Sequence, residues 1–199
     1  MGSKRKTRPG KIVSAAAVCV FAAGILSACA NPQKEGTAAL EEGNYEEALA
    51  QFQEAADSSD REKSAEGYRG LGMAYYESGE YVKALESFQK AVDLGTKETV
   101  QLYHLMSVCG MQTWTGEEED DTAYSSVLEY IQTGLALADA DDSEEAPDAD
   151  MIREMKYNEI ICYEKLADWE NARQKAEEYL GEYPDDEAVQ KEAEFLETR

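Results

Sequence analysis

An internal repeat constrains the fold of this chain more than any other feature of its sequence. Residues 43–55 (GNYEEALAQFQEA) align without gaps with residues 79–91 (GEYVKALESFQKA). The same frame returns at residues 168–172 (DWENA), and a weaker copy lies at residues 124–134. The aromatic markers of the four copies are 36, 43 and 45 residues apart: Tyr45, Tyr81, Tyr124 and Trp169. Self-similarity at such a period predicts similar supersecondary units stacked along the chain.

Apolar residues at helical spacing indicate that each unit is a pair of helices. Residues 71, 75, 85, 88 and 92 are apolar or aromatic and share buried faces at the 3.6-residue period. Glycine and proline interrupt the pattern at Gly43, Gly79, Gly95 and Pro184. The sequence therefore predicts an all-α chain with helices at residues 33–43, 45–57, 61–78, 81–93, 97–112, 122–138, 149–166, 169–182 and 186–197.

The repeated residues resemble the signature of the tetratricopeptide repeat (TPR) family. The positions that match are Gly36, Ala48, Phe52, Tyr68, Leu71, Gly72, Tyr75, Ala84, Phe88, Ala172 and Pro184. The resemblance is strongest in the second copy and weakest in the third, where Val127 replaces the small alanine. It implies a helix-turn-helix solenoid of about four repeats over residues 33–199, closed by a C-terminal capping helix.

The signature has a physical basis in close helix packing. Small residues at Ala48, Ala84 and Ala172 let the two antiparallel helices of a pair approach, and Gly72 does the same from the opposing helix. The rings of Phe52 and Phe88, one turn further on, fill the space toward the next pair. One pair cannot cover its own apolar face, so the pairs must stack.

The N-terminus resembles a bacterial lipoprotein signal. Five basic residues precede an apolar run of about 14 residues, Ile12 to Ile25, which is too short to span a bilayer. The run ends at Leu26-Ser27-Ala28-Cys29, which is similar to a lipobox. The resemblance implies a signal peptide at residues 1–28, lipidation of Cys29 and a short tether at residues 29–32. A plain secretory peptide and an uncleaved anchor are the alternatives.

A lipidated Cys29 would place the protein on the extracytoplasmic face of the cell membrane. Two acyl chains give a stable anchor, whereas one binds only marginally. Ala30 follows the cysteine, which permits the outer membrane in an organism that has one. Almost no linker separates Cys29 from the first predicted helix, so the solenoid would lie close to the bilayer.

The chain is strongly acidic, which restricts its partners. It has 42 acidic and 19 basic residues, a formal net charge of −23. Removal of residues 1–28 would leave 14 basic residues against 42 acidic ones, a net charge of −28. Such a surface repels nucleic acid and anionic headgroups. We therefore expect a neutral or basic protein or peptide partner, although acidity can also serve solubility alone.

The sequence offers no residues for catalysis or a cofactor. The single histidine, His104, lies beside Leu102 and Leu105 in a predicted helix, a typical structural position. Hydrolase, metalloprotease, P-loop and dinucleotide motifs are absent. The two remaining cysteines, Cys109 and Cys162, lack metal-ligand spacing, and we expect buried free thiols rather than a disulfide. We predict no enzyme activity, no cofactor and no metal.

Two acidic insertions, at about residues 113–122 and 139–150, interrupt the third repeat. They lack the ligand spacing and turn glycine of a calcium-binding EF-hand loop. A solvated loop is the simplest interpretation, and a docking site for a basic partner or a cation-responsive module are the alternatives.

The family resemblance further implies a peptide-binding concave face, formed mainly by the first helix of each pair. The contact residues that it implies are Arg69, Met73, Tyr76, Tyr103, Met111 and Tyr157. The asparagine clamp of chaperone-tail binders is missing, because Thr37, Met73, Ser107 and Ile161 stand in its place. We expect a membrane-anchored scaffold that binds a protein or peptide. A structural subunit of a cell-envelope or secretion assembly is the alternative.

Overall fold

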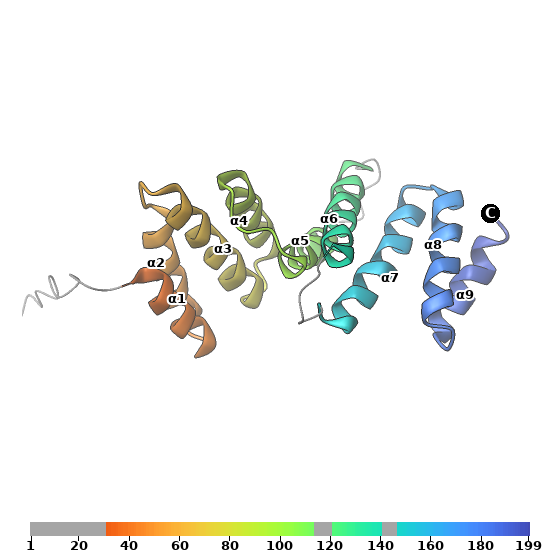
Figure 1. Ribbon diagram of the computed structural model, residues 1–199, viewed down its shortest axis with the longest axis horizontal. Helices are drawn as coiled ribbons and strands as arrows, with labels where there is room; N and C mark the ends of the chain where they lie inside the picture. The colour runs from red at the N-terminus through yellow and green to blue at the C-terminus, as the bar shows by residue number, and fades with distance from the viewer. Residues whose placement is uncertain (1–30, 114–120, 141–146) are drawn as a thin grey trace, which may run out of the picture. The chain divides into compact units, whose positions relative to one another are not determined.

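The computed structural model describes residues 31–113, 121–140 and 147–199 of the chain. Cys29, the predicted signal peptide and the centres of the two acidic insertions lie outside these residues. Residues 31–199 form one compact unit. Within the described residues every regular element is a helix (Figure 1). The helices are α1 (Pro32–Glu41), α2 (Tyr45–Ala56), α3 (Arg61–Glu77), α4 (Tyr81–Leu94), α5 (Val100–Thr113), α6 (Asp121–Asp139), α7 (Ala149–Lys165), α8 (Trp169–Glu182) and α9 (Glu187–Leu196).

Each helix packs against the next one along the chain, as Figure 1 shows from α1 to α9. The first helices of neighbouring pairs also contact each other, α1 with α3 and α5 with α7. The first helices therefore share one side of the stack. Apart from α5, every helix begins and ends within two residues of its predicted bounds.

Short polar side chains define the helix starts. Asn44, Asp60, Asp168 and Asp186 each accept a hydrogen bond from a backbone N–H in the first turn of the helix that follows. Helix α5 begins at Val100, three residues later than the sequence predicted, because Thr99 Oγ1 accepts the Leu102 N–H at 3.1 Å. The chain before Thr99 is thus a connection rather than a first turn.

The signature residues pack as their sizes predict. Ala48, Ala84 and Ala172 are fully buried, and the rings of Phe52 and Phe88 are almost so. A Cβ atom at Gly72 would lie 2.4 Å from the Phe88 ring, closer than a carbon atom can approach. The tight pair α3–α4 therefore requires glycine at this position.

Both cysteines within the described residues are buried and free. Cys109 lies in α5 and Cys162 in α7, and burial raises the pKa of each thiol to about 12. A neutral, inaccessible thiol reacts slowly, so these residues act as core packing. The expectation of free thiols is confirmed.

Candidate functional site

The first helices present a face, here called the first-helix face, that combines aromatic, apolar and acidic side chains. It consists of Arg69, Met73, Tyr76, His104, Met111, Glu154 and Tyr157 from α3, α5 and α7. These side chains are half-buried except Glu154, which is exposed.

Helix α3 places Arg69, Met73 and Tyr76 along one side. Arg69 forms an ion pair with Glu66 at 3.0 Å, and Met73 packs against the core between α4 and α5. The Tyr76 ring meets that of Tyr81 edge to face, with centroids 5.8 Å apart. Burial is the main cause of its raised pKa, and Cys109 of α5 and Glu154 of α7 add to it. Tyr76 also packs against the core cluster that contains Cys109 of α5.

Helices α5 and α7 are joined by a polar contact across this face. His104 Nε2 lies 3.0 Å from Glu154 Oε2. The imidazole is mostly buried, while the carboxylate is 52% exposed. His104, expected from sequence to be structural, thus bridges two repeats. His104 is the only histidine of the sequence, so no second imidazole is available for acid-base chemistry.

Tyr157 lies beside a pocket at the C-terminal end of this face. The pocket has a volume of about 440 Å³ and is lined by Arg153, Glu154, Tyr157 and Asp186, among others. The Tyr157 ring contacts that of Tyr179 edge to face at 6.4 Å. A half-buried tyrosine beside an open pocket provides apolar area at small entropic cost.

The structure separates one of the six predicted contact residues, Tyr103, from the other five. Tyr103 is only 7% exposed, and its hydroxyl donates to Glu98 Oε2 at 2.8 Å. Burial, followed by that hydrogen bond, raises its pKa to about 12. Met111 packs against the core between α6 and α7. Met111 is nevertheless half-buried, like Met73, so five predicted contact residues remain partly accessible: Arg69, Met73, Tyr76, Met111 and Tyr157.

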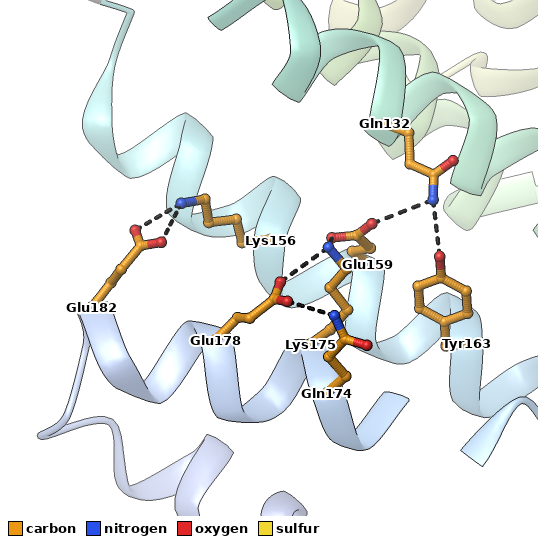
Figure 2. Close-up of polar contacts among 8 residues, drawn as sticks. All are labelled: Gln132, Lys156, Glu159, Tyr163, Gln174, Lys175, Glu178 and Glu182. Carbon is orange, nitrogen blue, oxygen red and sulfur yellow. Dashed lines mark hydrogen bonds and ion pairs between the residues drawn. The ribbon is translucent and has the colours of Figure 1, made fainter. Parts of the chain in front are cut away.

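A second candidate is a polar groove between α6, α7 and α8, on the opposite side of α7 (Figure 2). Its volume is about 450 Å³. Residues 152, 156 and 159 of α7 line this groove, and residues 154, 157 and 161 face the other way, as the helical period requires.

The groove contains a nearly buried carboxylate. The side chain of Glu159 is 5% exposed and lies 3.5 Å from Lys175 Nζ, while Gln132 Nε2 donates to its other oxygen at 3.4 Å. Gln132 also donates to the Tyr163 hydroxyl at 2.9 Å, so the network joins α6 to α7 (Figure 2). Sequence reasoning missed Glu159, because one acid among 42 carries no signal.

Three other charged side chains of the groove, Lys156, Glu178 and Glu182, also have partners within the chain. Lys156 Nζ donates to both carboxylate oxygens of Glu182, at 2.6 and 2.7 Å. Hydrogen bonds from Gln174 and then Lys175 lower the pKa of Glu178. A ligand would have to replace these contacts. The groove is therefore better explained as a structural network that ties the third repeat to the fourth.

The described residues show no arrangement suited to a metal ion or to a membrane span. Over residues 31–113, 121–140 and 147–199, no three His, Cys, Asp or Glu side chains converge as metal ligands. Within the same ranges no helix combines the length and apolarity needed to cross a bilayer. The centres of the acidic insertions fall outside these ranges, so a cation-responsive module stays an alternative there.

Comparison with protein-family models finds the tetratricopeptide repeat twice, at residues 34–98 and 157–186. No curated protein sequence matches the chain. The two matches carry three of the four sequence copies, and the weak third copy falls between them.

Solved structures with the same fold include two TPR proteins of similar length. "YrrB: a TPR protein with an unusual peptide-binding site" superposes with a TM-score of 0.65 at 17% identity, over 83% of this chain and 74% of that one. MamA superposes with a TM-score of 0.61 at 14% identity, over 83% and 78%. These likenesses and the family-model matches confirm the predicted fold class, an all-α solenoid with tetratricopeptide repeats.

Proposed function

We propose that this chain, whose fold is a TPR-type solenoid, is a scaffold that holds a protein or peptide partner through its first-helix face. The observation that carries the proposal is that Met73, Tyr76 and Tyr157 are partly accessible and Glu154 is exposed, on the side that the first helices share. Tyrosine and methionine are enriched in protein interfaces and adapt to an extended peptide.

Two further observations support this face over the groove at Glu159. In the groove, Lys156 pairs with Glu182, and Lys175 pairs with Glu178. By contrast, the Glu154 carboxylate is half exposed and lies beside the His104 imidazole. The solved YrrB structure is described as having a peptide-binding site on a solenoid of the same fold.

The charge of the chain favours a neutral or basic partner. The accessible carboxylate of Glu154 and a formal net charge of −23 attract cationic segments and repel acidic ones. The partner contact would therefore weaken as salt is raised.

We place this scaffold on the extracytoplasmic face of the membrane, held by a lipid on Cys29. The support is the lipobox-like Leu26-Ser27-Ala28-Cys29 after a basic and then apolar segment. Replacing Cys29 with serine tests it: the protein should move from the membrane fraction to the soluble fraction. Unchanged membrane retention of Cys29→Ser would exclude the lipid anchor.

Co-purification tests the partner-binding face. The protein is isolated with its partners from solubilised membranes, as wild type, as Tyr76→Ser/Tyr157→Ser, and as the matched control Glu86→Ser/Lys90→Ser on the exposed side of α4. We expect the tyrosine pair to lose a partner that the wild type and the control retain. Equal recovery from all three proteins would argue against the first-helix face.

A further inference from the structure

The chain itself shows how an arginine is held at the pocket beside Tyr157. Arg153 of α7 lines this pocket and donates to Asp186 Oδ2 at 2.7 Å and to the Tyr179 hydroxyl at 2.9 Å. Its guanidinium also lies over the ring of Tyr183, 5.2 Å from the ring centroid. A carboxylate and an aromatic ring together therefore hold this cation, an arrangement that suits the flat guanidinium of arginine.

Glu154 and Tyr157 provide a second carboxylate and a second ring at the same pocket. Both residues line it, and they lie three positions apart on α7, so their side chains share one side of the helix. The contact of Glu154 with His104 uses one carboxylate oxygen, Oε2. An ionised carboxylate has acceptor sites on both oxygens, so Oε1 can accept a hydrogen bond from a partner.

The charge of the pocket favours a cation as its occupant. Its lining contains three acids, Asp150, Glu154 and Asp186, and one cation, Arg153. Arg153 is paired with Asp186 at 2.7 Å, so Asp150 and Glu154 make the lining negative. An acidic side chain would be repelled there. An apolar side chain would displace water from these carboxylates and offer no hydrogen bond in return.

The size of the pocket suits one long side chain. Its volume is about 440 Å³, and pockets that hold small ligands begin at roughly 300 Å³. The start of α9 also lines it, at Asp186 and the exposed Ala188. The methylenes of a long side chain can therefore contact apolar atoms of the lining while its charged end reaches the carboxylate of Glu154.

We propose that this pocket, here called the arginine pocket, binds an arginine side chain of the partner, with the guanidinium over the Tyr157 ring and donating to Glu154. Arginine suits the pocket better than lysine, because its planar head stacks on a ring and donates to a carboxylate at the same time. The inference rests on the proposed function of the first-helix face, and it narrows the expected basic partner to one with an accessible arginine.

Titration of the full chain with short peptides tests the arginine pocket without the partner. The probes are acetyl-Gly-Arg-Gly-amide and the same peptide with citrulline, which has nearly the shape of arginine but no charge. Amide shifts in NMR spectra report both the Kd and the place of binding. We expect the arginine peptide to shift the amides of residues 153–157 and 186–188. Its Kd should be about tenfold lower than that of the citrulline peptide, because it gains a cation–π contact and a charge-assisted hydrogen bond.

Three variants separate the pocket from general attraction to an acidic surface. Glu154→Gln keeps an oxygen that can accept from His104 but loses the charge, and should raise the Kd of the arginine peptide about fivefold. Tyr157→Leu keeps apolar bulk but loses the ring, and should raise it about threefold. The matched control Glu194→Gln removes an exposed acid of α9 outside the lining, and should stay within about twofold of the wild type.

Equal affinity for the two peptides would overturn the proposal. Shifts spread over the whole acidic surface, or an unchanged Kd in Glu154→Gln or in Tyr157→Leu, would do the same. If Glu154→Gln does not fold, Tyr157→Leu and the two peptides decide the matter. Recovery of a partner through the first-helix face, without any preference for the arginine peptide, would remove the pocket alone. A preference for that peptide, without any recovered partner, would count against the proposed function and leave the pocket.

Discussion

A single backbone conformation at residue 167 shows how strictly the helix turns are specified. Gly43 and Gly79 end their helices at φ of 72° and 78°, and Ala167 occupies the equivalent place at φ of 54°. In each turn the next residue donates its N–H to a carbonyl five residues back, as Asp168 does to Tyr163 at 2.9 Å. Ala167 thus adopts a left-handed conformation that its Cβ disfavours.

Replacing Ala167 with glycine should therefore stabilise the fold. We expect the free energy of unfolding to rise by about 1 kcal/mol, because glycine relieves the left-handed strain. Urea denaturation measures the change. The control Ala50→Gly, at an exposed position within α2, should lose about 1 kcal/mol instead. A loss of stability in Ala167→Gly would contradict this account of the turn.

The packing of Gly72 leads to the opposite prediction. In Gly72→Ala the new Cβ would lie 2.4 Å from the Phe88 ring, so α3 and α4 must separate or the ring must move. We expect a loss of about 1–3 kcal/mol in urea denaturation.

Gly181 provides the matched control for Gly72→Ala. It lies in α8, and nothing is within 4 Å of the Cβ that alanine would add there. Gly181→Ala should therefore gain up to about 1 kcal/mol from helix propensity. If Gly72→Ala and Gly181→Ala change the free energy of unfolding equally, the close contact between α3 and α4 does not require glycine at residue 72.

Among the elements, α9 depends on contacts that the sequence did not reveal. Asp186 caps its first turn through the Ala188 and Val189 amides, at 3.1 and 3.3 Å. The same side chain accepts hydrogen bonds from Arg153 of α7 and from the Tyr179 hydroxyl of α8. One aspartate therefore starts α9 and attaches it to the last helix pair.

Removal of this carboxylate should loosen α9 while the preceding repeats stay folded. We expect Asp186→Ala to lower the free energy of unfolding by about 1–2 kcal/mol, and the exposed neighbour Asp185→Ala to change it little. Hydrogen bonds from Arg153 and then Tyr179 lower the pKa of Asp186 to about 2. Its contribution is thus present above pH 3.8 and is lost as the pH falls toward 2. Thermal melts across this range should show a smaller acid loss in the variant; an identical loss would contradict the assignment.

The helices could be predicted from the sequence because their signals are local. Glycine breaks, capping residues and 3.6-residue spacing act within one helix or one turn, and they placed α2 and α8 to within one residue. The start of α5 was wrong by three residues because a threonine cap and an extended connection look alike in sequence. Contacts such as Glu159 with Lys175 depend on the separation of two helices, which no local pattern fixes.

The candidate site was less predictable for the same reason. Helical register placed Tyr76 and Tyr157 on the shared side of the first helices, where the structure also has them. It also placed Tyr103 there, yet that ring is buried, with its Cβ close to Gly134 of the long α6. This difference between prediction and structure lies in the third repeat, which matches the repeat signature least well. The burial of its residues depends on how far α6 lies from α5, which the repeat pattern does not specify.

At the scale of the whole molecule, the chain combines a solenoid of helix pairs with an N-terminal segment that resembles a lipoprotein signal. A stack of helix pairs provides an extended surface for a partner. A lipid on Cys29 would confine that surface to a membrane, where a partner at low abundance meets it at high local concentration. The central claim is that the first-helix face is where this partner binds.

In-cell photocross-linking tests this claim most directly. A photoreactive residue is placed at Tyr157, at Glu154 and, as the control on another exposed surface, at Glu86 of α4, and cross-linked proteins of the membrane fraction are identified by mass spectrometry. The account predicts one reproducible partner from residues 154 and 157 that is absent from residue 86. The same partner from all three positions, or a partner from residue 86 alone, would contradict it.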